Sequence, residues 1–161
     1  DDYATALRQA VDLLGGIAPL NTPEREVTIK VGIFDPKSRH HTGSAALGGI
    51  IGLFDRAPRV LLAESDNYCG KALDRLQTCY GGLFSERVMP YSLSGQPGSL
   101  TRCIAGEEMD LAPALFKPNV LVSTHMTSQL ERIGDQVVNV VQSLQMMRSA
   151  PTPPPLLPSC A

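Results

Sequence analysis

The sequence contains no tryptophan, and aromatic residues make up only 5% of its 161 residues. Proteins that stack single-stranded nucleic acids need clustered aromatic side chains, so this class is not indicated. Basic residues are not in excess either, because 14 Lys and Arg are balanced by 16 Asp and Glu, for a net charge of −2. A broad basic face for phosphate backbones is therefore excluded, and we expect no nucleic-acid partner.

Long apolar runs and several familiar motifs are also missing. No apolar run approaches the ~20 residues that a membrane span requires, so we expect no membrane partner. The opening stretch DDYATALRQAVDLL is acidic and amphipathic, unlike a signal peptide, which favours a cytoplasmic location. The four cysteines form no C-x-x-C pair, and no G-x-G-x-x-G, P-loop or G-x-S-x-G motif occurs. The sequence thus contains no motif that indicates a zinc, nucleotide or serine-hydrolase site.

The chain does contain three short apolar runs that end abruptly in charged or hydroxyl-bearing residues. They are VTIKVGIFD (27–35), VLLAESD (60–66) and VLVSTH (120–125). Such runs are typical of strands buried in an open parallel sheet. Because ligands of these sheets bind outside the carboxyl ends of the strands, the sequence predicts a site at that edge.

The alternation of apolar patterns predicts an α/β fold: a three-layer domain with a mostly parallel sheet and helices on both faces. The expected helices cover 2–14, 45–54, 68–80 and 112–116, and further strands are expected at 87–92 and 100–105. We expect Thr42 or Ser44 to cap helix 45–54, and its small residues to lie against the sheet.

The last third of the chain changes character. Residues 127–148 have the apolar spacing of a long amphipathic helix, and residues 149–161 (SAPTPPPLLPSCA) are too rich in proline to continue it. We therefore divide the chain into an α/β domain (1–126), a C-terminal helix (127–148) and an extended or disordered tail (149–161). The helix is expected to pack on the sheet or on a second copy or partner protein.

Several phrases of the first 125 residues resemble a family known only as a domain of unknown function. They are DDYATALRQAVDLLGG, VTIKVGIFDPKSRHHT, RAPRVLLAESDNYCGKALDRLQ and LFKPNVLVSTHM. Members are often described as iron–sulfur proteins because many carry a fused ferredoxin module. The resemblance implies an α/β domain with a polar site at strand ends, and it implies no particular activity. This chain has no ferredoxin module, so no iron–sulfur cluster is expected on it.

The segment LERIGDQVVNVV (130–141) is similar to the repeated helix motif of PhoU-type phosphate-uptake regulators. Those proteins are all-helical and bind metal through the Glu and Asp of the motif. The similarity would make Glu131 and Asp135 metal ligands, but only one such helix occurs here. The alternative is that the two carboxylates, four residues apart, are simply solvated.

Three groups of polar residues could carry chemistry at the strand ends. Lys37, His40, His41 and Thr42 precede a helix N-terminus and could bind an anion, with a solvated basic loop as the alternative. Glu64 and Asp66, with Asp35 or His125, could hold Mg²⁺ or act as acid and base. Alternatively, Asp66 caps a helix and Glu64 pairs with Lys30 or Lys71.

The third group lies in and around the last expected strand (119–124) and could bind a ligand through hydrogen bonds, with His125 as a proton carrier. Its members, together with Lys30 inside the first strand, are the remaining ligand-binding candidates: Lys117, Asn119, Ser123 and Thr124. The sequence thus predicts a domain that binds a small anionic ligand, with a divalent cation as a possible cofactor and catalysis left open. The competing hypothesis is a non-enzymatic regulatory or interaction module that acts through residues 127–148.

Overall fold

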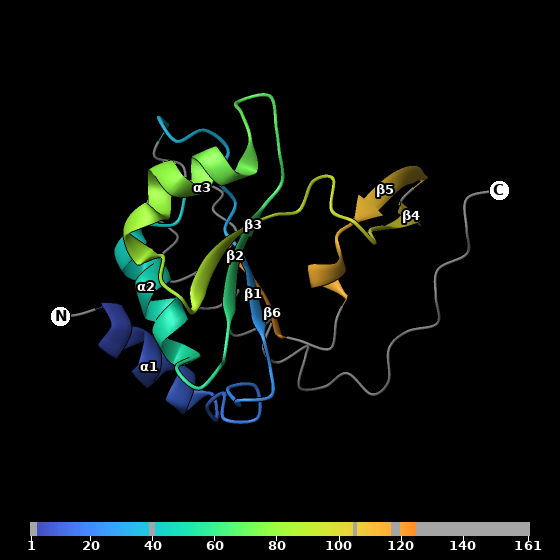
Figure 1. Cartoon of the computed structure of the whole chain (residues 1–161). Helices are drawn as coiled ribbons and strands as arrows, with labels where there is room; N and C mark the ends of the chain where they lie inside the picture. The colour runs from blue at the N-terminus through green and yellow to red at the C-terminus, as the bar shows by residue number, and fades with distance from the viewer. Residues whose placement is uncertain (1–2, 39–40, 105, 117–119, 125–161) are drawn as a thin grey trace.

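The computed structural model describes residues 3–38, 41–104, 106–116 and 120–124 (Figure 1). This part of the chain contains three α-helices, six strands and two short 3₁₀ helices. In chain order the elements are α1 (Tyr3–Leu13), β1 (Val27–Lys30), α2 (Ser44–Leu53), β2 (Val60–Glu64), α3 (Ala72–Tyr80), η1 (Gly81–Leu83), β3 (Val88–Ser92), β4 (Leu100–Ile104), β5 (Glu107–Leu111), η2 (Pro113–Leu115) and β6 (Val120–Ser123).

Four of the strands form one parallel sheet, so the predicted α/β class is confirmed. Its strand order is β3-β2-β1-β6. Val27 at the start of β1 is in register with Val60 on one side and Val120 on the other. From β1 the chain adds β2 and then β3 in one direction, and it returns to add β6 beside β1. The order therefore reverses between β1 and β6, which is where sheets of this kind bind ligands.

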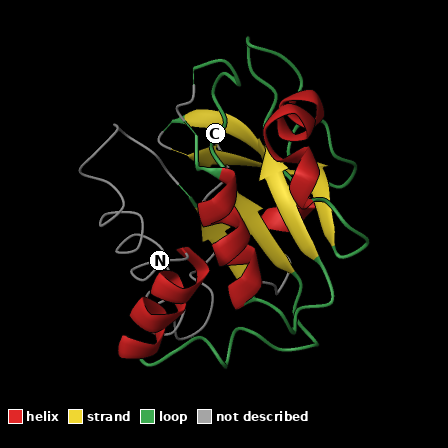
Figure 2. Cartoon of the chain, turned by 90° about the vertical axis from the view of Figure 1, so that its left-hand side faces the viewer, coloured by secondary structure: helices red, strands yellow, loops and turns green. Residues whose placement is uncertain are grey.

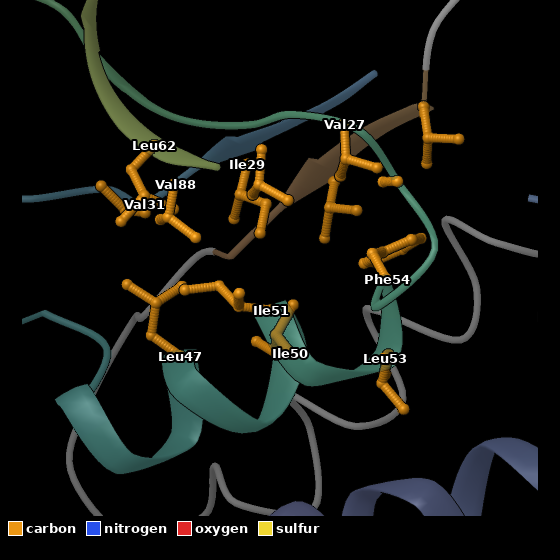
Figure 3. Packing of buried hydrophobic residues seen from close by; sticks show 14 of the residues in the cluster. Val27, Ile29, Val31, Leu47, Ile50, Ile51, Leu53, Phe54, Leu62 and Val88 are labelled. Carbon is orange, nitrogen blue, oxygen red and sulfur yellow. The ribbon is translucent and has the colours of Figure 1, made fainter. Parts of the chain in front are cut away.

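The main core lies between the sheet and α2. Alternate strand residues point towards this helix because successive side chains of a strand lie on opposite faces. Figure 3 shows Val27, Ile29 and Leu62 pointing from the strands towards Leu47 and Ile51 of α2. The strand residues in this cluster are Val27, Ile29, Val60, Leu62, Val88, Val120 and Val122. Burying such side chains contributes about 1.5–3 kcal/mol each.

In the described residues, all three α-helices lie on one side of the sheet (Figures 1 and 2). The other side carries a smaller cluster made by Ala63, Leu93 and Ala112, and Thr28 of β1 hydrogen-bonds the carbonyl of Ala114 in η2. The expected short helix at 112–116 is thus the 3₁₀ turn η2. The predicted helices on both faces are not found in the described residues, and the helix expected at 127–148 lies outside them.

Gly49 of α2 faces another helix, and Ala45 of the same helix is exposed. A Cβ added at Gly49 would lie 3.3 Å from Cα of Ala4 in α1. The large residues of α2 fill the space above the sheet instead, so the expectation that its small side lies on the sheet was wrong. Because Gly49 has no side chain, α1 and α2 can approach each other closely.

The strand predicted at 100–105 is one arm of a hairpin. β4 and β5 pair antiparallel, with Leu100 opposite Leu111, and they form a separate two-stranded sheet. In the described part of the chain, no helix has the length and apolar character of a membrane span.

Candidate functional site

The carboxyl ends of β1 and β6 are joined by hydrogen bonds around Thr124. Its N–H donates to the carbonyl of Lys30 (2.8 Å), and its hydroxyl lies 3.1 Å from the hydroxyl of Thr42. Gly32 has φ +65°, and a Cβ there would lie 3.1 Å from the carbonyl oxygen of Thr124. A side chain at position 32 would therefore separate the two strand ends. Two predicted candidates, Thr42 and Thr124, do meet here, and both are buried.

Tyr80, the last residue of α3, holds the loop before α2 in place. The buried Tyr80 hydroxyl donates to the carbonyl of Thr42 (2.7 Å), and the ring meets that of His41 edge-on with centroids 5.9 Å apart. Burial raises the pKa of Tyr80 well above its ordinary value. The tyrosine therefore stays protonated and holds the loop in place.

Replacing Tyr80 by Phe should test this anchor through pH. The unfolded tyrosine ionises near pH 10, so the stability tied to the raised pKa is complete below pH ~10 and is lost as the pH rises further. At pH 7 the variant should lose about 1–2 kcal/mol, because the carbonyl of Thr42 loses its donor. Above pH 10 the free energy of unfolding, measured in urea, should fall less steeply with pH in Tyr80→Phe than in wild type. The two slopes should differ by up to ~1.4 kcal/mol per pH unit. The exposed Tyr3→Phe variant is the control, and equal slopes in Tyr80→Phe and wild type would contradict the anchor.

Glu64 is buried at the end of β2 and has three partners. Its carboxylate accepts from the ammonium of Lys30 (2.6 Å), the N–H of Ile33 (2.6 Å) and the N–H of Ser65 (2.8 Å). These bonds tie the end of β2 to the loop that follows β1. Glu64 therefore forms the ion pair with Lys30 that was its alternative role.

Arg75 of α3 holds the same loop from the other side. It is buried, and its guanidinium donates to the carbonyls of Ile33, Phe34 and Ser65. Ile33 thus accepts a hydrogen bond from the Arg75 guanidinium at its C=O and donates one to the Glu64 carboxylate from its N–H. Glu64 and Arg75 together fix the backbone at the carboxyl ends of β1 and β2.

Asp66 joins β2 to α3. Its carboxylate accepts from the N–H of Ala72, the first residue of α3, and from the ammonium of Lys71, both at 2.8 Å. The bond from Lys71 lowers the pKa of Asp66 below its ordinary value, and the Ala72 N–H adds to this. Asp66 therefore binds the first N–H group of α3, although the N-cap position belongs to Lys71 and α3 begins at Ala72 and not at residue 68.

The three carboxylates proposed as metal ligands have separate partners. Asp35 accepts from the N–H of Lys37 (2.9 Å) within its own turn, while Glu64 and Asp66 are bound as above. Within the described ranges, no three His, Cys, Asp or Glu residues gather in a way that could hold a metal ion. The described geometry therefore offers no support for a metal held by Asp35, Glu64 and Asp66.

The N-terminus of α2 is open. Gly43 is the N-cap, and among the described residues no side chain caps the helix, because Thr42 turns towards Thr124 and the hydroxyl of Ser44 bonds the carbonyl of Cys79 (3.3 Å). The expected cap from Thr42 or Ser44 was therefore wrong. Gly43, Ser44 and Ala45 are exposed, and the first N–H groups of an α-helix have no partner within the helix. Lys37 is exposed nearby in sequence, and among the described residues its ammonium forms no ion pair.

The remaining predicted residues are placed only in part. Ser123 is exposed at the end of β6, in register with Lys30. Six candidates lie outside the described residues: His40, Lys117, Asn119, His125, Glu131 and Asp135.

Sequence reasoning missed Arg75, Tyr80 and Gly32. Arg75 carried a usable signal, because it lies on the stripe of α3 that also includes Ala72, Leu76 and Tyr80, all of them buried. A charged residue on an apolar stripe indicates a buried charge with partners. Gly32 carried no signal, because its close approach to Thr124 joins residues 92 positions apart.

Comparison with known proteins adds no assignment. The chain matches no protein-family model, no curated protein and no solved structure. The two resemblances drawn from the sequence therefore stay predictions.

Proposed function

We propose that the protein binds a small anionic ligand at the carboxyl edge of its sheet, where the loop after β1 leads into α2 beside the end of β6. The single observation that carries this proposal is the uncapped, exposed first turn of α2 at the point where the strand order reverses.

Two properties of this turn support an anion. The first N–H groups of a helix have no partner within it, and the helix dipole favours negative charge there. Carboxylates that could fill the position are engaged elsewhere: Asp35 binds the N–H of Lys37, and Asp66 binds α3.

The surroundings favour a fixed site. Thr42, next to the N-cap, is held by Thr124 and by the hydroxyl of Tyr80. A preorganised loop loses little entropy when a ligand binds. Lys37 adds a positive charge to the same loop, and the sequence adds Arg39. A metal is not part of the proposal.

A carboxylate built into the turn should compete with the ligand. In Ala45→Glu the new side chain lies at the second helical position, where negative charge stabilises a helix by about 0.3–1 kcal/mol. Stability should therefore be kept or raised while phosphate binding weakens about 10- to 100-fold, as expected for loss of a charge-assisted hydrogen bond. Titration calorimetry with inorganic phosphate at constant ionic strength measures both the affinity and the number of sites.

Two controls separate the site from net charge. Ala45→Gln has nearly the same shape and no charge, so it should bind phosphate within about threefold of wild type. Lys37→Glu should weaken binding, whereas Arg25→Glu, an equal charge change at an exposed residue just before β1, should not. Equal losses in Lys37→Glu and Arg25→Glu, or no phosphate binding by wild type, would rule out the proposed site.

A further inference from the structure

The β4–β5 hairpin stands apart from the main sheet. In the described part of the chain its two strands pair only with each other, and Figure 1 shows them on the side of the sheet away from the helices. Neither of the two apolar clusters includes a described residue of these strands. Because a two-stranded hairpin is at best marginally stable in water by itself, a further attachment would stabilise this one.

Cys103 lies on the polar face of this hairpin. It is half-buried in β4, directly opposite Glu108 of β5. Residues that are opposite or two positions apart share one face of an antiparallel pair, so Thr101 and Asp110 belong to the same face as Cys103. The hydroxyl of Thr101 donates to the carboxylate of Asp110 (2.7 Å), and both residues are exposed, as is Glu108. The face that carries Cys103 is therefore turned to solvent and not to the core.

The cysteines of the chain differ in state. Cys103 is disulfide-bonded, whereas Cys69 and Cys79 are free thiols. Burial raises the pKa of the Cys79 thiol, which keeps it protonated and less reactive at neutral pH. The sequence contains four cysteines, and the fourth is Cys160. Within one chain, Cys160 is thus the only cysteine left to be the partner of Cys103.

We propose that Cys103 forms a disulfide with Cys160 of the same chain, which fastens the C-terminal segment to the β4–β5 hairpin. Cys160 follows Thr124, at the end of β6, by 36 positions. An extended chain of that length reaches ~120 Å, much further than the width of a domain of this size. The segment can therefore return from the end of β6 to β4 without displacing either strand.

The bond forms by thiol–disulfide exchange with a small disulfide such as oxidised glutathione. The thiolate of one cysteine attacks it and releases one reduced glutathione, and the second thiolate then resolves the mixed disulfide and releases another. Each cysteine loses one proton and one electron, and the glutathione disulfide takes up both pairs. In a reducing cytoplasm such bonds form only on oxidation, whereas in an oxidising compartment they persist. The attachment of the C-terminal segment therefore depends on the redox state of its surroundings.

Peptide mapping of the full chain tests the pairing. The protein is equilibrated in a buffer with an excess of reduced over oxidised glutathione, denatured, alkylated with N-ethylmaleimide and digested with trypsin. Peptide 103–132 contains only Cys103 and peptide 149–161 contains only Cys160. Mass spectrometry should find these two peptides joined in most chains and separate after reduction. Two cysteines per chain, Cys69 and Cys79, should be alkylated before reduction.

Variants and a non-reducing gel complete the test. Cys160→Ser should release Cys103, so that three cysteines are alkylated without reduction, while Cys79→Ser should keep the two peptides joined. The oxidised chain should run as a monomer on the gel. Because alkylation is done in denaturant, the result does not depend on how well a variant folds. A bond from Cys103 to Cys69, a bond between two chains, or alkylation of all four cysteines in the equilibrated protein would overturn the pairing.

Discussion

Replacing Glu64 by alanine should destabilise the protein by about 2–5 kcal/mol, chiefly because two backbone N–H donors lose their acceptor, while the partly exposed Lys30 can turn to solvent. The variant leaves the N–H groups of Ile33 and Ser65 and the ammonium of Lys30 without their acceptor. Each buried donor left without a partner costs about 1–3 kcal/mol. Urea unfolding followed by circular dichroism measures the loss.

Glu64→Gln separates charge from shape in this experiment. It keeps one acceptor oxygen but turns an amide N–H₂ towards donors, so we expect a smaller loss than in Glu64→Ala. Glu86→Ala, at an exposed residue, is the control and should stay within about 0.5 kcal/mol of wild type. A loss below about 1 kcal/mol in Glu64→Ala would mean that the carboxylate does not hold the strand ends together.

Replacing Arg75 by methionine should cost a similar amount, about 2–5 kcal/mol, because three backbone carbonyls lose their donor. Methionine fills much of the same space, so the loss reports mainly the donors to the carbonyls of Ile33, Phe34 and Ser65. Arg75→Lys should recover only part of the stability, because an ammonium is a point charge and cannot reproduce the planar fork of donors. Gln77→Ala, on the exposed face of α3, is the matched control.

Because Glu64 and Arg75 bind the N–H and the C=O of the same residue, Ile33, their effects should not add. The double variant should be more stable than the sum of the two single losses predicts, by about 0.5–3 kcal/mol. Additive losses would show that the two residues support the loop independently.

The sheet could be predicted because each of its central strands is a short apolar run, and such runs carry their signal locally. β1, β2 and β6 are parallel and adjacent, as the shared polar ends of those runs suggested. The packing of the helices on one another was harder to predict from the sequence. Nothing local in α2 shows that Gly49 meets Ala4 of α1, since that contact depends on how the first helix docks.

The location of the site could be predicted from the sequence, but the roles of its individual residues were harder to predict. Thr42 and Thr124 meet as their positions at the strand ends implied, but they bond each other and the backbone. Glu64 ends β2 and Asp66 follows it, yet Glu64 is buried against Lys30 and Asp66 binds the first N–H group of α3. A carboxylate at a strand end looks the same in sequence whether it binds a ligand or the protein's own backbone. Its hydrogen-bond partners, which come from distant segments, decide between the two.

The most direct test of the account is a phosphate titration followed residue by residue through the backbone amide signals in nitrogen–proton NMR spectra. The account predicts saturable shifts of the Ser44, Ala45 and Ala46 amides, while those of Arg25 and Glu26, just before β1, stay unchanged. Shifts spread evenly over both edges of the sheet, or none in the first turn of α2, would contradict an anion site at the carboxyl edge.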